Sequence, residues 1–113
     1  MADNEWVREF PAAVMVCDES GTITELNDRA ARNYESEGGR ALVGKDLLAC
    51  HPEPARTKLA ALIDRREANV YTIEKHGLKK LIYQTPWFRD GRYAGFVEIS
   101  FEIPADMPHF VRS

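Results

Sequence analysis

The sequence has few cysteines, and none in a metal-binding arrangement. Only Cys17 and Cys50 occur among its 113 residues, each inside a short apolar run. No C-x-x-C pair is present, which excludes the clustered-cysteine type of zinc site. Two isolated cysteines of this kind are expected to be buried, reduced thiols. We therefore expect no metal site and a cytoplasmic location.

Long hydrophobic runs and a strong charge of one sign are also missing. No stretch approaches the roughly 20 apolar residues of a membrane-spanning helix. The acidic residues 1–5 lack the apolar region of a signal peptide. Lys and Arg number 15 against 18 Asp and Glu, which gives a net charge of −3 and no basic excess for nucleic-acid binding. We expect neither a membrane nor a nucleic acid as partner.

Catalytic motifs are absent as well. The sequence contains no G-x-G-x-x-G pattern and no phosphate-binding loop of the Walker type. No serine, lysine or carboxylate pair stands in a recognisable catalytic arrangement. We therefore expect that the chain is not an enzyme and has no catalytic residues.

Apolar residues make up 44% of the chain, enough for one globular domain with a core. Apolar or alternating segments predict strands at residues 12–17 and 22–26, joined as a hairpin by an acidic-glycine turn. Three further alternating segments, 70–75, 80–88 and 93–102, are separated by tight turns. Strands joined in that way pair antiparallel.

Helical signals lie between and before these strands. Asn27 is a predicted N-cap of a short helix, and apolar spacing predicts a longer helix near residues 55–66. Residues 1–10 form a predicted N-terminal cap segment, residues 11–103 the domain, and residues 104–113 a tail. A hairpin and a meander around helices predict an α+β domain with helices on one sheet face.

Stretches at residues 10–23, 26–31, 42–45 and 91–100 resemble the PAS domain family, and the resemblance spans roughly residues 8–103. It implies a five-stranded antiparallel sheet in the order 2-1-5-4-3, with helices that often enclose a ligand pocket. It also implies a sensory or protein-interaction module of signal transduction, with a signalling protein as partner. A small-molecule carrier or an enzyme that uses the same pocket is the alternative, because a fold does not fix a function.

Apolar and aromatic residues on facing elements predict the lining of that pocket. Small-molecule sites combine such side chains with a few polar groups, here tyrosine hydroxyls. Without a ligand the same side chains would form an ordinary core. The predicted lining residues are Tyr34, Leu59, Ile63, Tyr71, Tyr83, Val97 and Ile99.

His51 precedes the 55–66 helix, and we expect it to fix the loop at the start of that helix. Haem ligation by His51, making the chain a haem-based sensor, is the alternative, so the cofactor stays unknown. His76 and His109 lie far away in the sequence and make no metal site with it. Cys50 and His51 are expected to point apart on an extended segment, which disfavours a thiolate pair.

Both faces of the last strands are partly apolar, whereas a solvated sheet face is more polar. An exposed apolar patch usually marks an interface. We therefore predict a homodimer with residues 1–10 packed on the open sheet face, their own or the partner's. The alternative is a monomer whose own N-terminal segment, with Trp6, Val7 and Phe10, hides the patch.

Overall fold

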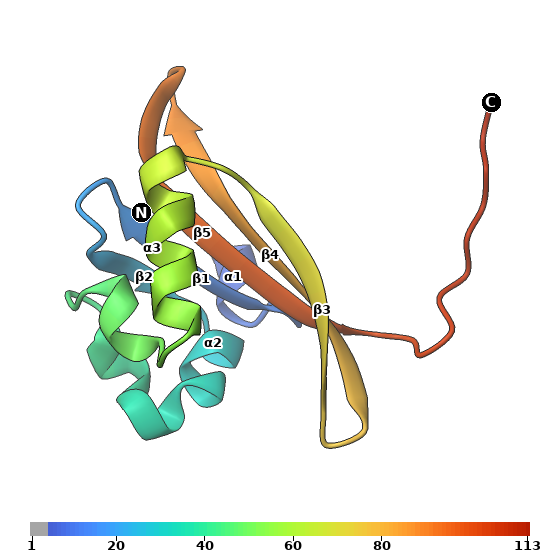
Figure 1. The fold of residues 1–113 in the computed structure, drawn as a ribbon. Coiled ribbons are helices and arrows are strands. Elements are labelled where there is room, and N and C mark those ends of the chain that lie inside the picture. The colour runs from blue at the N-terminus through green and yellow to red at the C-terminus, as the bar shows by residue number, and fades with distance from the viewer. Residues whose placement is uncertain (1–4) are drawn as a thin grey trace.

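The centre of the molecule is one five-stranded antiparallel sheet in the order β2-β1-β5-β4-β3. It is seen in a computed structural model that describes residues 5–113 (Figure 1). The order and the antiparallel pairing expected from the sequence are confirmed. The strands are β1 (Ala13–Asp18), β2 (Ile23–Leu26), β3 (Asn69–Lys75), β4 (Leu78–Arg89) and β5 (Arg92–Ile103).

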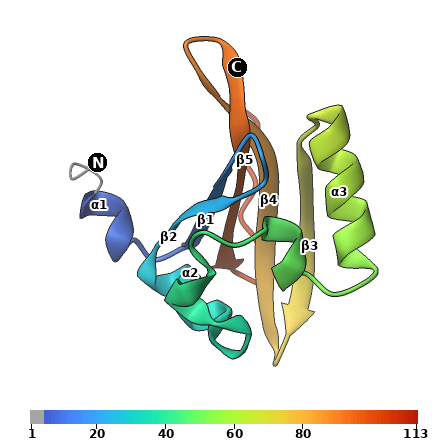
Figure 2. The same ribbon diagram turned by 90° about the vertical axis from the view of Figure 1, so that its left-hand side faces the viewer.

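The helical segments lie mainly between β2 and β3. Figures 1 and 2 show α3 on one side of the sheet and α1 on the other. Residues 1–4 of the predicted N-terminal segment lie outside the described residues. The segments are α1 (Glu5–Arg8), α2 (Asp28–Asn33), α3 (Ala55–Arg65) and three 3₁₀ helices, η1 (Glu35–Glu37), η2 (Gly39–Leu42) and η3 (Leu47–Cys50).

Asn27 caps α2, as its sequence position predicts, and also joins three parts of the chain. Its Oδ1 accepts the backbone N–H of Ala30 at 3.0 Å and that of Val14 at 2.9 Å. Its Nδ2 donates to the carbonyl oxygens of Ala12 at 2.7 Å and Val7 at 3.0 Å. The amide is therefore fully bonded although it is buried, and it ties α1 and the start of β1 to α2.

The core lies between the sheet and the helices α2, η2, η3 and α3. Its largest fully buried side chains include Met15 on β1, Ile23 on β2 and Phe96 on β5. Leu59 is the buried residue of α3. Burying a side chain of this size stabilises the fold by about 1.5–3 kcal/mol.

The two faces of the sheet differ from our expectation for β4 and β5. Tyr71 pairs with Ile82, whereas Tyr83 pairs with Ile99. Directly paired residues share a face, and neighbours along a strand point to opposite faces. Tyr83, Ile99 and Val97 therefore lie on the face away from the core, which we call the open face. The prediction that they lie against α3 is wrong.

The core side, which we call the cavity face, carries a less apolar set on the central strand. Phe96, Glu98 and Ser100 point to it from β5, and Ile82 and Gln84 from β4. The sequence predicts that the more apolar residues of β5 face the core, and this prediction is wrong. The inward residues of β5 line cavities with partly polar walls, and its outward residues remain partly exposed.

Candidate functional site

The site is built around the carboxylate of Glu98, on the cavity face of β5, with its side chain only 17% exposed. Oε1 accepts the hydroxyl of Tyr34 at 3.2 Å, and Oε2 accepts Nε2 of Gln84 at 3.1 Å. Gln84 pairs with Glu98 across the sheet, and its Oε1 accepts Nδ2 of Asn69 at 3.2 Å. A chain of hydrogen bonds therefore crosses β3, β4 and β5 and ends at Tyr34, the C-cap of α2.

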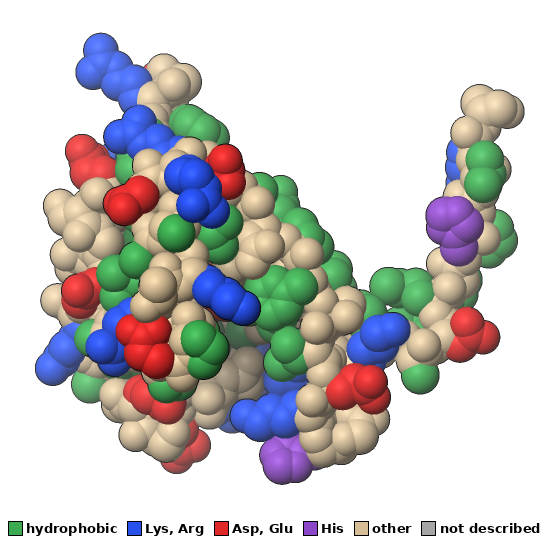
Figure 3. All heavy atoms as spheres, in the orientation of Figure 1, with side chains coloured by type: hydrophobic (Ala, Val, Ile, Leu, Met, Phe, Trp, Pro, Cys, Tyr) green, Lys and Arg blue, Asp and Glu red, His purple; other side chains and the backbone are tan. Residues whose placement is uncertain are grey.

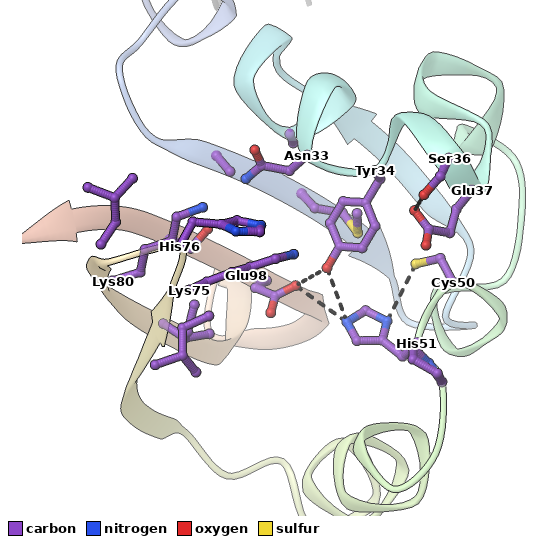
Figure 4. Close-up of a pocket in the computed structure, with 18 residues that line it drawn as sticks. Asn33, Tyr34, Ser36, Glu37, Cys50, His51, Lys75, His76, Lys80 and Glu98 are labelled. Carbon is purple, nitrogen blue, oxygen red and sulfur yellow. Dashed lines mark hydrogen bonds and ion pairs between the residues drawn. The ribbon is translucent and has the colours of Figure 1, made fainter.

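His51 reaches the same carboxylate from the end of η3 (Figure 4). Its Nε2 lies 3.5 Å from Oε1 of Glu98, and its Nδ1 lies 3.0 Å from the carbonyl oxygen of Leu47. A carbonyl oxygen and an ionised carboxylate only accept hydrogen bonds. A ring protonated at both nitrogens satisfies both neighbours.

The ionisation of this cluster follows from its contacts. Burial disfavours the charged ring, but the hydrogen bonds with Cys50 and Glu98 and the charge of Glu98 outweigh it and raise the pKa of His51 to about 10. Burial likewise opposes the charge on Glu98, while His51, Gln84 and Tyr34 hold its pKa below the usual value. Burial and the nearby Glu98 raise the pKa of Tyr34, so its hydroxyl remains a donor. His51 and Glu98 thus form a buried ion pair.

Two cavities of about 520 Å³ each lie beside this pair, and His51 lines both. The α3 cavity is lined by His51, Pro54, Ala55, Lys58, Leu59, Leu62, Asn69, Tyr71 and Gln84. The α2 cavity (Figure 4) is lined by Ala13, Met15, Ala30, Asn33, Tyr34, Ser36, Glu37, Cys50, His51, Pro52, Ile73, Lys75, His76, Leu78, Lys80, Ile82, Glu98 and Ser100.

Comparison with known proteins places the fold. No protein-family model and no curated protein matches the chain. A sensory box sensor histidine kinase from Vibrio cholerae matches at 14% identity and TM-score 0.66, over 91% of this chain and 90% of that one. The PAS domain of Bordetella pertussis BvgS matches at 18% and 0.65, over 87% and 81%. This chain is a PAS-fold domain.

A third PAS-fold match is the Aer2 receptor from Vibrio cholerae, described as a dual PAS–haem oxygen sensor. It shares 18% identity at a TM-score of 0.57, over 82% of this chain and 95% of that one. In the present PAS fold, both ring nitrogens of His51 already face hydrogen-bonding partners. The residues here do not offer a free imidazole to a haem iron and therefore do not fit haem.

The PAS fold brings some of the predicted pocket residues together and separates others. Tyr34 lines the α2 cavity, and Leu59 and Tyr71 line the α3 cavity. Ile63 is half-buried and packs against the core. The remaining three predicted residues lie on the open face, as described above. A role of Tyr34, Leu59, Ile63 or Tyr71 in binding a ligand stays a prediction.

Our sequence reading missed Glu98, the residue at the centre of the cluster. A carboxylate flanked by apolar residues in a central strand was the available signal. The reading of Cys50 was also wrong, because its Sγ lies 3.4 Å from Nδ1 of His51 and donates to the carbonyl oxygen of Leu47 at 3.1 Å. The two residues meet because they close a 3₁₀ turn and do not continue an extended segment.

Residues 5–113 contain neither a cluster of metal-ligating side chains nor a membrane-spanning helix. No three or more His, Cys, Asp and Glu side chains in this range are grouped so that they would hold a metal ion. Within the same range, no helix has both the length and the apolar character needed to cross a bilayer.

Proposed function

We propose that this PAS-fold domain is a sensory module of a cytoplasmic signalling protein that binds a small molecule in the α2 cavity. The buried Glu98 cluster in the wall of that cavity carries the proposal. A buried ion pair usually stabilises a fold no better than well-packed apolar residues do. Polar groups that converge on a cavity of several hundred Å³ are typical of ligand sites. The sensor domains among the similar structures support the same reading.

Binding fits the cluster better than catalysis does. A general acid or base works best with a pKa near the operating pH. Contacts hold the pKa of Glu98 low and raise the pKa of His51 to about 10. Both groups therefore keep their charge near neutral pH, which suits recognition and not proton transfer.

We further propose that the domain signals through contacts on its open face, with a second copy of the chain as the partner. Apolar side chains there remain accessible, with Val70 56% and Tyr83 40% exposed. α1 lies on the same side of the sheet (Figure 2), but its Trp6 is 69% exposed and leaves Val70 and Tyr83 uncovered. Two-fold pairing is the commonest arrangement that buries such a patch.

Native mass spectrometry tests ligand binding. We expect the full chain, purified from its host or incubated with a low-molecular-mass host extract, to carry a mass excess that disappears on denaturation. Ser100→Phe, which fills the α2 cavity, should lose that excess, and Thr85→Phe on the open face should keep it. A wild-type mass equal to that of the polypeptide under both conditions contradicts the proposal.

A further inference from the structure

The β3–β4 hairpin presents two lysines to the α2 cavity. Its register pairs Ile73 with Lys80 and Lys75 with Leu78. Lys75 and Lys80 are therefore diagonal neighbours on the cavity face, roughly 7–8 Å apart at the backbone. Figure 4 shows both lysines on the hairpin side of Glu98, across from Tyr34. Figure 3 shows basic side chains and a histidine where the surface is hollowed beside the hairpin.

Neither lysine has a carboxylate partner within 4.0 Å among residues 5–113. The ion pairs in this part of the chain are Arg8–Glu9, Arg40–Asp28, His51–Glu98 and Arg65–Glu67. Two ammonium groups of like charge on one face repel each other. An anion between them removes that repulsion and gains charge-assisted hydrogen bonds.

The acidic residues of the cavity do not fill this role. Glu98 is matched by His51, and its two oxygens accept Tyr34 and Gln84. Glu37, on the opposite wall, accepts the hydroxyl of Ser36 at 3.0 Å. The charge of the two lysines is therefore available to a ligand.

Part of the cavity wall, beside the Glu98 cluster, is apolar. Met15 and Ile82 are buried in its wall, and Ile73 lies opposite Lys80 on the hairpin, two residues before Lys75. Burial of hydrocarbon against such groups favours binding. The cavity therefore combines two lysines at its rim with an apolar part of its wall.

We infer that the α2 cavity binds a small organic carboxylate with an apolar body, its carboxylate held between Lys75 and Lys80 and its body packed on Met15 and Ile82. This inference rests on the proposed function and gives it a ligand class.

Three probes with the same hydrocarbon chain test it: octanoate, octan-1-ol and octylamine, each titrated into the full chain by calorimetry. We expect octanoate to bind about tenfold more tightly than the alcohol, and the amine to bind more weakly than both. Added sodium chloride should weaken the binding of octanoate and leave the binding of octan-1-ol unchanged, because salt screens the charge of the acid and the alcohol has none.

Substitutions at the rim separate charge from shape. Lys75→Met and Lys80→Met should each lower the affinity for octanoate about tenfold and leave the affinity for octan-1-ol unchanged. Lys79→Met is the matched control, because Lys79 is the next residue on the same strand and lies on the open face; it should have no effect. Thermal melts followed by circular dichroism identify any variant that has lost its fold. Lys80→Glu, which reverses the charge at the rim, is then measured in place of that variant.

Several results overturn the inference. Equal affinity for acid and alcohol, undiminished octanoate binding in both lysine variants, or no binding of any probe would each do so. The proposed function survives these results if native mass spectrometry still shows a small molecule lost on filling the cavity with Ser100→Phe. It fails if the chain carries no ligand in that experiment or if Ser100→Phe retains the ligand.

Discussion

The indole N–H of Trp87 donates to the carbonyl oxygen of Cys17 at 3.0 Å and so joins β4 to β1 across the central strand β5. Gly95 lies between them, paired with Trp87 on one side and Asp18 on the other. The absence of a side chain at Gly95 allows the strands to approach closely. A Cβ built there would lie 1.9 Å from the oxygen of Cys17.

Gly95→Ala should therefore destabilise the domain by about 3 kcal/mol or more, since the contact is with backbone and Gly95 has a φ of 146° that L-residues rarely adopt. Urea denaturation measures the loss. Gly91→Ala is the control, because Gly91 also has positive φ (78°) but nothing within 4 Å of its added Cβ. It should lose only about 1 kcal/mol. Equal losses in the two variants would contradict the steric argument.

The His51–Glu98 pair makes stability depend on pH in a defined direction. The pKa of His51 is raised from 6.5 to about 10. The stability that His51 contributes to the fold is therefore complete below pH 6.5 and is lost as pH rises toward 10. The pKa of Glu98 is lowered from 4.5, so its contribution is present above pH 4.5 and is lost as pH falls through its folded value. Stability from this pair is therefore greatest between pH 4.5 and 6.5.

We expect the free energy of unfolding to fall by on the order of 3 kcal/mol between pH 6.5 and 9, and to fall far less in Glu98→Gln. Proton NMR of the His51 ring gives an independent reading in the wild-type chain. Its resonances should still be those of imidazolium at pH 8. A His51 titration centred near 6.5 would refute the ion pair.

Asn27→Ala should cost about 3 kcal/mol or more, because it removes a helix cap and leaves buried backbone groups of Val14 and Ala12 without partners. Thermal unfolding measures this loss. Asn33→Ala, at the end of α2, is the control and should change stability by less than about 1 kcal/mol. A small effect at Asn27 would mean that other groups replace its hydrogen bonds.

Charge on the open face should prevent self-association. Sedimentation velocity at micromolar concentration is expected to show a dimer for the wild-type chain and a monomer for Val70→Lys and Tyr83→Lys, because an ammonium group on this face opposes burial. Arg65→Glu on α3 should remain dimeric. A monomer mass for both the full chain and a variant lacking residues 1–10 would rule out the homodimer.

Strand positions and the antiparallel pairing of consecutive strands could be predicted because turns and alternation are local signals, whereas the strand order followed from the resemblance to the PAS family. The cap at Asn27 was predictable for the same reason. The face of β5 was not, because Val97 and Ile99 are more apolar than Glu98, and a pattern rule places the apolar set inside. The contact of Glu98 with His51 depends on how η3 packs against the sheet, and no local pattern encodes that distance.

The position of Glu98 on β5 has a mechanical consequence. Val97 and Ile99 flank it and point to the opposite face of the same strand, each about 3.3 Å away along the backbone. On the proposed function, a small rotation of β5 about its long axis that shifts Glu98 on the cavity face would swing Val97 and Ile99 the other way. An event in the cavity and a change on the open face would then be separated by no more than the thickness of a single sheet.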